Sequence, residues 1–279
     1  MRTFFLLFSL FIISNCKAQE LFPYAEPASN MPSKSISVKL GAMYGKGVHR
    51  NGTLQRYMPE VMFGLNKNWM IHASLGFSDM HETYFYYESA KIYAKYRFLS
   101  LDEIHKHFRM AAFASATYSR NHLDHNEINL QYGDQSGIQA GIIATQLWHK
   151  FAISGTASIS EVLDEVRSLK QSPQPYAFES FNYSLSAGYL VFPRSYIDYD
   201  QINLNIYAEL IGGRNINWPQ EKYYVDLAPS VQLIFNSTSK LNLGYRFQLN
   251  SDIYRLMKKS FMISYERIFL NALRSKKRK

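Results

Sequence analysis

Apolar and polar residues alternate with a period of two in runs of about ten residues, and such runs recur along most of the chain. Between Trp69 and Phe77, every odd-numbered residue is apolar or aromatic, whereas the even-numbered residues are Met, His, Ser and Gly. Successive side chains of a β-strand point to opposite faces of the sheet, so each run predicts a strand with one apolar face. The run length matches the roughly 9–11 residues that a tilted strand needs to cross a bilayer.

Twelve runs are present, and the connections between them alternate in length. Those after the second, sixth and tenth runs are brief, whereas the connections after the third, fifth and seventh are long and polar. Short turns on one side and long loops on the other are typical of outer-membrane barrels, which have an even number of strands. We therefore predict an all-β, antiparallel transmembrane β-barrel of about 12 strands, with 10–14 compatible with ambiguous run ends. The runs are residues 35–44, 57–65, 69–77, 90–98, 108–118, 136–145, 151–160, 181–192, 202–212, 223–235, 241–249 and 261–269.

Aromatic residues make up 15% of the chain, and on the apolar faces they gather at the strand ends. Rings at both ends form the girdles with which membrane barrels contact the two membrane–water interfaces. A soluble barrel or sandwich has the same alternation, with its apolar face inward, but its core would place the rings centrally. The ring positions therefore favour a membrane barrel. The predicted girdles are Trp69, Phe98, Phe108, Phe151, Phe235 and Phe269 beside the short turns, and Tyr44, Tyr57, Phe77, Tyr118, Tyr223 and Phe261 at the opposite ends.

The N-terminus has the features of an export signal. Arg2 precedes an apolar stretch, and the small residue Ala18 suits a cleavage site. We predict that residues 1–18 are a signal peptide, which leaves a mature chain without cysteine. The alternative is a lipidated N-terminus at Cys16, although Asn15 fits poorly before such a cysteine.

Residues 19–34 carry three prolines, which predicts an extended segment that could fold into the barrel as a plug. The formal net charge of +9 includes two positive charges in the signal peptide and five after Phe269, which leaves +2 for the rest. A nucleic-acid partner would need basic residues clustered across the folded domain, so we expect none. We predict a barrel over residues 35–269 and a basic periplasmic tail over residues 270–279, close to anionic lipid headgroups.

Three stretches carry a resemblance to known barrels: residues 57–64 (YMPEVMFG), 93–98 (YAKYRF) and 226–232 (DLAPSVQ). They resemble a poorly characterised family of Gram-negative outer-membrane barrels and, more distantly, the barrels of phenol-degradation pathways and the fatty-acid transporters. The resemblance implies passage of small, including hydrophobic, molecules across the outer membrane. We accordingly expect a monomer inserted by the barrel-assembly machinery, with outer-membrane lipids and a small-molecule solute as partners and no cofactor.

The faces opposite the apolar ones mix both signs of charge with small residues, which suits a narrow lumen. Facing charges there are expected to pair, because an unpaired charge in a poorly hydrated interior is costly. Such pairs could form a structural network that partly closes the bore. Lys91, Lys95, Arg97 and Arg109, on neighbouring predicted strands, could instead form a cationic ladder that attracts anions. The lumen candidates are Lys39, Glu60, His72, Lys91, Lys95, Arg97, Arg109, Gln139, Glu209, Asp226, Arg246, Gln248 and Glu266.

Methionines share the inward parity on the first three runs and the last. Thioethers suit Cu(I), and His72, with His49 and His81 in loops, could extend a copper path. Flexible filling of apolar space is the simpler interpretation, and we favour it. The sequence His122-Leu123-Asp124-His125 could also hold a cation, but zinc sites need a third protein ligand, so we predict no metal there. The methionine stripe is Met43, Met58, Met62, Met70 and Met262.

We predict a passive transporter or narrow channel for small hydrophobic or anionic solutes in the outer membrane. A lipid hydrolase is disfavoured, because no histidine has the lipid-facing parity and no nucleophile lies at a readable spacing from a base. We therefore expect that the protein is not an enzyme. The main alternative is a structural or adhesive barrel that binds a ligand with outer loops such as residues 161–176.

Overall fold

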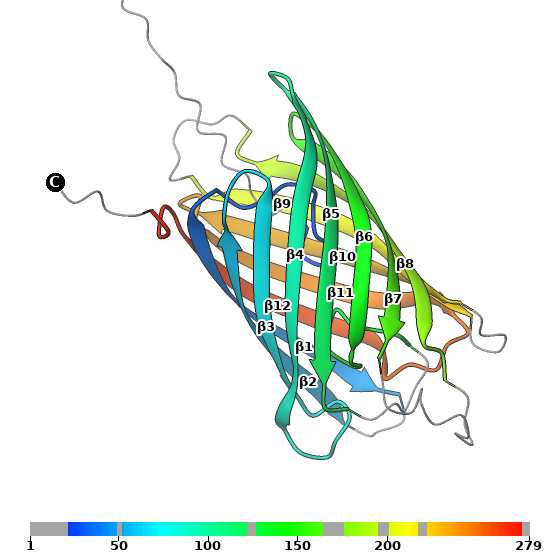
Figure 1. The fold of residues 1–279 in the computed structure, drawn as a ribbon. Coiled ribbons are helices and arrows are strands. Elements are labelled where there is room, and N and C mark those ends of the chain that lie inside the picture. Colours follow the sequence, from blue (N-terminus) through cyan, green and yellow to red (C-terminus); the bar gives the residue numbers. More distant parts are fainter. Residues whose placement is uncertain are drawn as a thin grey trace, which may run out of the picture.

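The computed structural model describes residues 22–48, 52–121, 127–163, 176–194, 201–216 and 222–274. These residues form twelve antiparallel strands that close into one barrel (Figure 1), so the predicted fold class is confirmed. Among them there is no helix of the length and apolar character that spanning a membrane requires. The strands are β1 (Ser35–Gly47), β2 (Thr53–Gly64), β3 (Trp69–Ser78), β4 (Tyr86–Asp102), β5 (Lys106–Ser119), β6 (Gly137–Trp148), β7 (Phe151–Val162), β8 (Glu179–Phe192), β9 (Asn203–Asn215), β10 (Tyr223–Phe235), β11 (Ser239–Ser251) and β12 (Met257–Phe269).

Each strand pairs with its neighbours in sequence, and β1 also pairs with β12, which closes the sheet. Ile36 lies opposite Phe269 in this closing pair, so both ends of the barrel chain meet at one rim. Most strands extend beyond the predicted runs; β4 is the largest case, covering Tyr86–Asp102 where residues 90–98 were predicted. Backbone hydrogen bonds between the strands continue beyond the stretch whose outer face is apolar. The alternation of residue types marks only that stretch, so it predicts strands that are too short.

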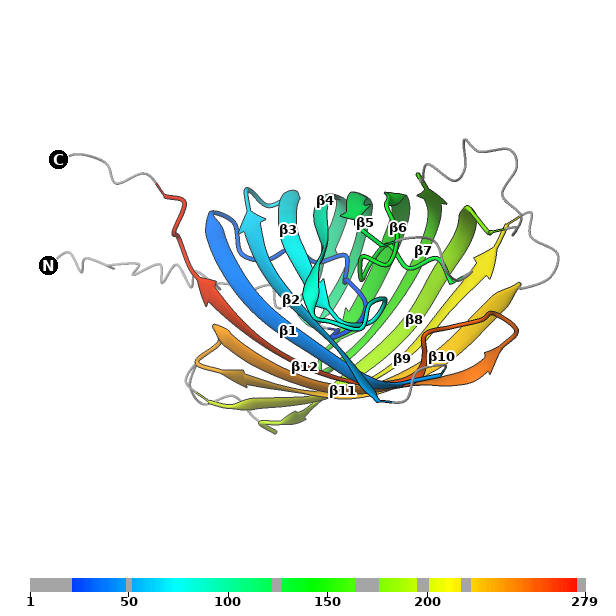
Figure 2. The same ribbon diagram turned by 90° about the horizontal axis from the view of Figure 1, so that it is seen from below.

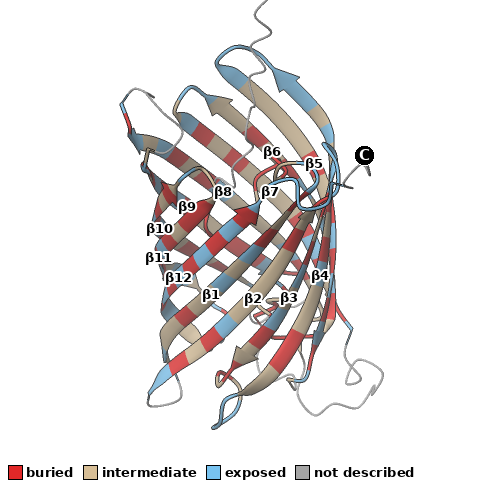
Figure 3. Ribbon diagram, turned by 90° about the vertical axis from the view of Figure 1, so that its left-hand side faces the viewer, coloured by how far each residue is buried: buried red, intermediate tan, exposed pale blue. Residues whose placement is uncertain are grey.

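Burial is the reverse of that in a soluble protein. The outward residues Leu40 and Ile92 are 59% and 63% exposed, whereas the inward Lys95 and Glu209 are fully buried. Figure 3 shows buried and exposed positions alternating along the strands. Exposed apolar side chains all around a barrel are stable only in an apolar surrounding, so this surface fits a bilayer and not water.

The twelve rings of the two predicted girdles are all partly or largely exposed. At the rim with the short turns, Trp69 and Phe269 are 44% and 50% exposed, and the Trp69 ring lies 4.8 Å from that of Tyr96. At the opposite rim, Tyr118 is 61% exposed and Phe261 42%. The rings thus face outward at both ends of the strands, where the interfaces of a bilayer would lie.

The two rims differ in their connections. The short-turn rim holds the tight connections β2–β3, β4–β5, β6–β7 and β10–β11, together with the longer β8–β9 connection. The long-loop rim holds the other connections, including residues 120–136 between β5 and β6. The chain around Lys34 and Leu273 leaves the barrel at the short-turn rim, where Leu273 N donates to Lys34 O. Residues 1–21 and 275–279, and also His49, His122 and His125, lie outside the described residues.

Ile142 lies midway along β6 and is 52% exposed on the outer surface. Replacement Ile142→Arg puts a charge near the middle of the apolar band and should lower the free energy of unfolding in lipid vesicles by about 2–4 kcal/mol. Urea titration followed by tryptophan fluorescence measures this loss. Ile104→Arg, in the β4–β5 turn at 89% exposure, is the matched control and should change stability little. Equal effects of the two substitutions would contradict a lipid-facing surface.

Candidate functional site

Two segments fill much of the bore. We call residues 22–34 the N-terminal insert and residues 127–136, from the β5–β6 connection, the loop insert. Figure 2 looks into the ring of strands and shows the dark blue N-terminal insert inside it. The two inserts meet where Gln131 Nε2 donates to Tyr24 O at 3.0 Å. They approach from opposite rims and leave a space between them.

The inner end of the N-terminal insert is held by a carboxylate. Glu209, on β9, is fully buried, and its two carboxylate oxygens accept the backbone N–H groups of Tyr24 at 3.0 Å and Ala25 at 2.8 Å. Ser186 on β8 donates a third hydrogen bond to the same carboxylate at 3.0 Å. Hydrogen bonds to an ionised acceptor are stronger than neutral ones, so Glu209 fixes the backbone of the insert against this wall.

A lysine holds the insert from the opposite wall. Lys95 Nζ, on β4, donates to Glu26 Oε2 at 3.0 Å, to Pro27 O at 2.7 Å and to Ser29 O at 3.0 Å. All three N–H groups of the ammonium are therefore used, which explains how a lysine is fully buried. Ala28 N donates to Thr145 Oγ1 on β6 at 2.8 Å. Arg109 on β5 adds a bond from Nη1 to Ser29 Oγ at 2.9 Å.

The loop insert packs on the inner wall and is clamped by ion pairs. Its Ile128 and Leu130 are buried against Val162 and Ala177, and Thr117 Oγ1 donates to Leu130 O at 2.9 Å. Loops usually lie in solvent, and here these contacts take the place of water around the loop insert. The insert therefore narrows the bore from the long-loop rim.

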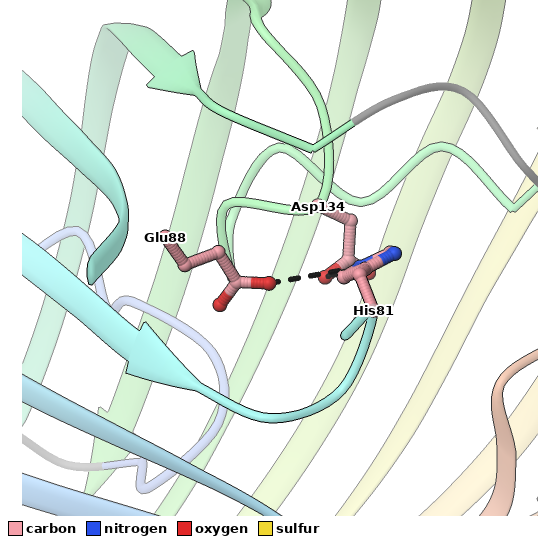
Figure 4. A group of neighbouring side chains, drawn as sticks. All are labelled: His81, Glu88 and Asp134. Carbon is pink, nitrogen blue, oxygen red and sulfur yellow. Dashed lines mark hydrogen bonds and ion pairs between the residues drawn. The ribbon is translucent and has the colours of Figure 1, made fainter. Parts of the chain in front are cut away.

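The first clamp joins β2, β4 and the loop insert. Arg56 forms a bidentate pair with Glu88 at 2.8 and 2.7 Å and also binds Asp134. His81 lies beside the same two carboxylates, with Nε2 at 3.6 Å from Glu88 Oε1 and 3.5 Å from Asp134 Oδ1 (Figure 4). The ligand atoms of these three residues lie within 4.8 Å of one another, a spacing that would suit a cation. The guanidinium of Arg56 already supplies that positive charge.

The second clamp is a network of two arginines and two acids. Arg255, between β11 and β12, binds Asp226 at 2.6 Å and Glu127 of the loop insert at 2.8 Å. Arg246 binds the same Asp226 at 2.6 Å. Burial lowers the pKa of Arg255, but the carboxylates of Glu127 and Asp226 outweigh this effect and hold that pKa above its usual range. Each clamp is buried and contains one bidentate arginine–carboxylate pair, Arg56–Glu88 or Arg255–Asp226, and the same arginine makes a further ion pair to the loop insert.

A cavity of about 200 Å³ lies between the two inserts. Its wall includes Tyr24 of the N-terminal insert and Gln131 and Tyr132 of the loop insert, together with inward residues of the barrel. The charged side chains on this wall come from Glu26, Lys39, Glu60, Lys91 and Arg246. The cavity is thus one part of the bore, among the described residues, that has room for a small solute.

The predicted lumen acids and their partners lie inside the barrel. Glu60 accepts from His72 Nδ1 at 2.9 Å and lies 4.0 Å from Lys39 Nζ. Near the short-turn rim, Glu266 binds Lys240 at 3.2 Å and Ser37 at 2.6 Å. Glu209, Asp226 and Arg246 take part in the contacts above, Gln139 donates to Ser158 at 2.9 Å, and Gln248 lies opposite Asp226 in the β10–β11 register. The expected pairing across the narrow bore is therefore seen for most of these groups.

The four residues of the predicted cationic ladder do not form one free row. Lys95 and Arg109 bind the N-terminal insert, and Arg109 also binds Asp102 at 2.9 Å. Lys91 Nζ donates to Gln131 O of the loop insert at 3.1 Å. Arg97 is half-buried on β4, next to the register shift that follows it. A role of these residues in selecting anions stays a prediction.

The predicted methionine stripe is divided among separate apolar contacts. Met43 packs with Leu54, Met58 and Met80 beneath the loop insert, and Met262 packs with Tyr24 and Ala228. Met70 Sδ accepts the backbone N–H of Met31 at 3.4 Å, and Met62 is buried beside His72 in the β2–β3 register. These contacts are those of flexible apolar filling. A copper-handling role stays a prediction that nothing in this packing favours.

Arg56, Glu88, Asp134 and Arg255 were missed in the sequence. Arg56 shares the inward parity of β2, so the alternation could have found it. Glu88 has the outward parity of Ala90, but the register shift between Gly76 and Phe77 turns it inward. Asp134 and Arg255 lie in connections, where alternation carries no information about direction.

No family model matches the sequence, and no curated protein matches it. Solved structures do match in fold. The COG4313 outer membrane channel from Pseudomonas putida F1 superposes with a TM-score of 0.59 at 12% sequence identity, covering 88% of this chain and 100% of that channel. The KdgM porin superposes with a TM-score of 0.50 at 6% identity, covering 83% of this chain and 98% of the porin. The chain therefore has the fold of outer-membrane channels.

Replacement Lys95→Met removes the donor that binds Glu26 and two carbonyls of the N-terminal insert. Each buried group left without a partner costs about 1–3 kcal/mol. The insert should therefore detach from its seat, by which we mean its contacts with Lys95 and Glu209. Hydrogen exchange of the Tyr24 and Ala25 amides should become faster by about tenfold or more. Lys67→Met, on an exposed short turn, serves as the control. Unchanged protection of these amides in Lys95→Met would contradict the conclusion that Lys95 holds the N-terminal insert in the bore.

Replacement Arg56→Met leaves Glu88 and Asp134 adjacent and without their cation. We expect the free energy of unfolding in lipid vesicles to fall by about 3–5 kcal/mol, because a buried charge loses its partner. The double variant Arg56→Met, Glu88→Gln should recover part of the loss. The exposed Arg120→Met is the control, and a loss for Arg56→Met no larger than for this control would show that the clamp does not stabilise the barrel.

Proposed function

We propose that the protein is an outer-membrane barrel that acts as a narrow, plugged, passive channel for small solutes. The observation that carries this proposal is the cavity between the two inserts, which meet inside a polar bore. The apolar outer surface supports a position of the bore across a bilayer, and the predicted export signal supports the outer membrane of a Gram-negative cell as its location.

The fold shared with the COG4313 channel and the KdgM porin supports transport as the task of this barrel. A passive route needs a bore that a solute can enter and leave, with contacts weak enough to release it. The N-terminal insert is the element proposed to move, because among the described residues it continues covalently into the barrel only at Ser35 and is held otherwise by non-covalent contacts: hydrogen bonds, the Glu26–Lys95 ion pair and the packing of Phe22 and Tyr24. We propose that its displacement opens the channel.

A structural or adhesive barrel is the competing function, and the filled bore is the observation that favours it. Such a barrel would keep both inserts in place permanently and use its long connections outside the membrane. Of the 161–176 connection predicted as a binding loop, residues 164–175 lie outside the described residues. Electrical recordings separate the two functions.

Single-channel conductance of the refolded full-length mature chain should be small in planar bilayers. A variant that lacks residues 19–34 should conduct about threefold more, because the bore loses one of its two obstructions. Lys95→Met should open intermittently to the larger level, and Lys67→Met should behave as the unchanged chain. If the truncated barrel is folded and conducts no ions, the channel function is wrong and the structural function takes its place.

A further inference from the structure

The cavity between the inserts has the size of a binding site for one small solute. Its volume of about 200 Å³ exceeds the space of a single water molecule several times over. Side chains of both inserts and of the barrel contribute to its wall, so a molecule inside would touch all three. The chemistry of this wall decides which class of solute fits.

Among the described residues, Lys91 on the cavity wall has the carboxylates of Glu60 and Glu26 in its surroundings but forms a close ion pair with neither. Glu26 is paired with Lys95, and Glu60 is shared between Lys39 and His72. Lys91 lines the cavity, and its Nζ donates to the neutral carbonyl of Gln131. Within the described part of the chain Lys91 forms no ion pair. An ammonium has three N–H donors, so two remain for a ligand, and an anion there would offset the cost of a positive charge in the bore.

The uncharged part of the wall is rich in hydroxyl and amide groups. Some of these groups already bind a neighbour, such as Gln139 with Ser158 and Asn182 with Ser160, but hydroxyl groups on a solute can bind their remaining donors and acceptors, which a hydrocarbon cannot. The rings of Tyr93 and Phe113, stacked at 5.3 Å, supply one flat apolar wall. The hydroxyl and amide side chains on the wall include Ser74, Ser115, Gln139, Ser158, Asn182 and Ser264.

We propose that this cavity binds a small hydroxylated organic anion with one carboxylate, which pairs with Lys91. The inference deepens the proposed channel function by naming the class of solute. It differs from the hydrophobic solutes that the sequence resemblance implies, because the wall offers hydrogen-bonding partners that such solutes cannot use.

The site is composite, and this has a thermodynamic consequence. Glu26 and Tyr24 belong to the N-terminal insert, and Gln131 belongs to the loop insert. A solute that binds better when both inserts are seated must also stabilise the seated inserts by the same factor. Occupancy of the cavity and the position of the plug are therefore linked.

Gluconate and glucitol are matched probes, since both are open six-carbon chains rich in hydroxyl groups: glucitol carries six of them, and gluconate carries five with a carboxylate as its remaining carbon. Calorimetric titration of the full-length mature chain in detergent should give at least about tenfold tighter binding of gluconate. Lys91→Gln should abolish this preference, and Lys91→Arg should retain it. Lys222→Gln, in an exposed connection away from the cavity, is the control with the same change of charge.

Equal binding of the two probes, no binding of either, or a gluconate preference that survives Lys91→Gln would each overturn the proposal. Gel mobility with and without heating verifies that every variant is folded. The conductance experiment is read separately: a barrel that conducts but shows no gluconate preference refutes the solute class alone. A barrel that binds gluconate at Lys91 but never conducts refutes the channel and leaves the binding site.

Discussion

Closure of the sheet between β1 and β12 is the constraint on which the rest of the structure depends. In hydrocarbon, backbone N–H and C=O groups have no water to bind, and an open sheet edge would leave a row of them unpaired. The closed ladder satisfies these groups and fixes which side chains face lipid. Every second residue is then turned into a narrow bore, where charged groups such as Lys95 and Glu209 must find partners within reach.

The two inserts supply partners for these buried charged groups. Twelve strands enclose too little space for a wide aqueous pore, and facing walls of the bore come within reach of the same short segments. Glu209 and Lys95, from strands on different sides of the barrel, are both completed by backbone and side-chain groups of residues 24–29. The segment that obstructs the bore thus also supplies hydrogen-bond partners to two of its buried charged groups.

Alternation of residue types predicted the twelve strands, their pairing around the barrel and the inward direction of most charged residues. That is possible because a strand repeats every two residues and one of its faces must be apolar. Where the ladder shifts register, as beside Gly76 and Phe77, the rule fails, and Glu88 was therefore missed. The proline-rich N-terminus pointed to an extended segment, but the hydrogen bonds of Lys95 to Pro27 and Ser29 carbonyls depend on three-dimensional distance, which no sequence period encodes.

The seat of the N-terminal insert binds mainly main chain. Glu209 binds two consecutive amides, and two of the three bonds from Lys95 go to carbonyls, so the seat recognises chain direction and spacing more than side-chain identity. The backbone path of residues 24–29 is therefore under constraint, and Tyr24, Glu26 and Ser29 are constrained in addition by their side-chain contacts with Met262, Lys95 and Arg109. The wall residues Glu209 and Lys95 are under the stricter constraint, because no other side chain has the same charge and reach.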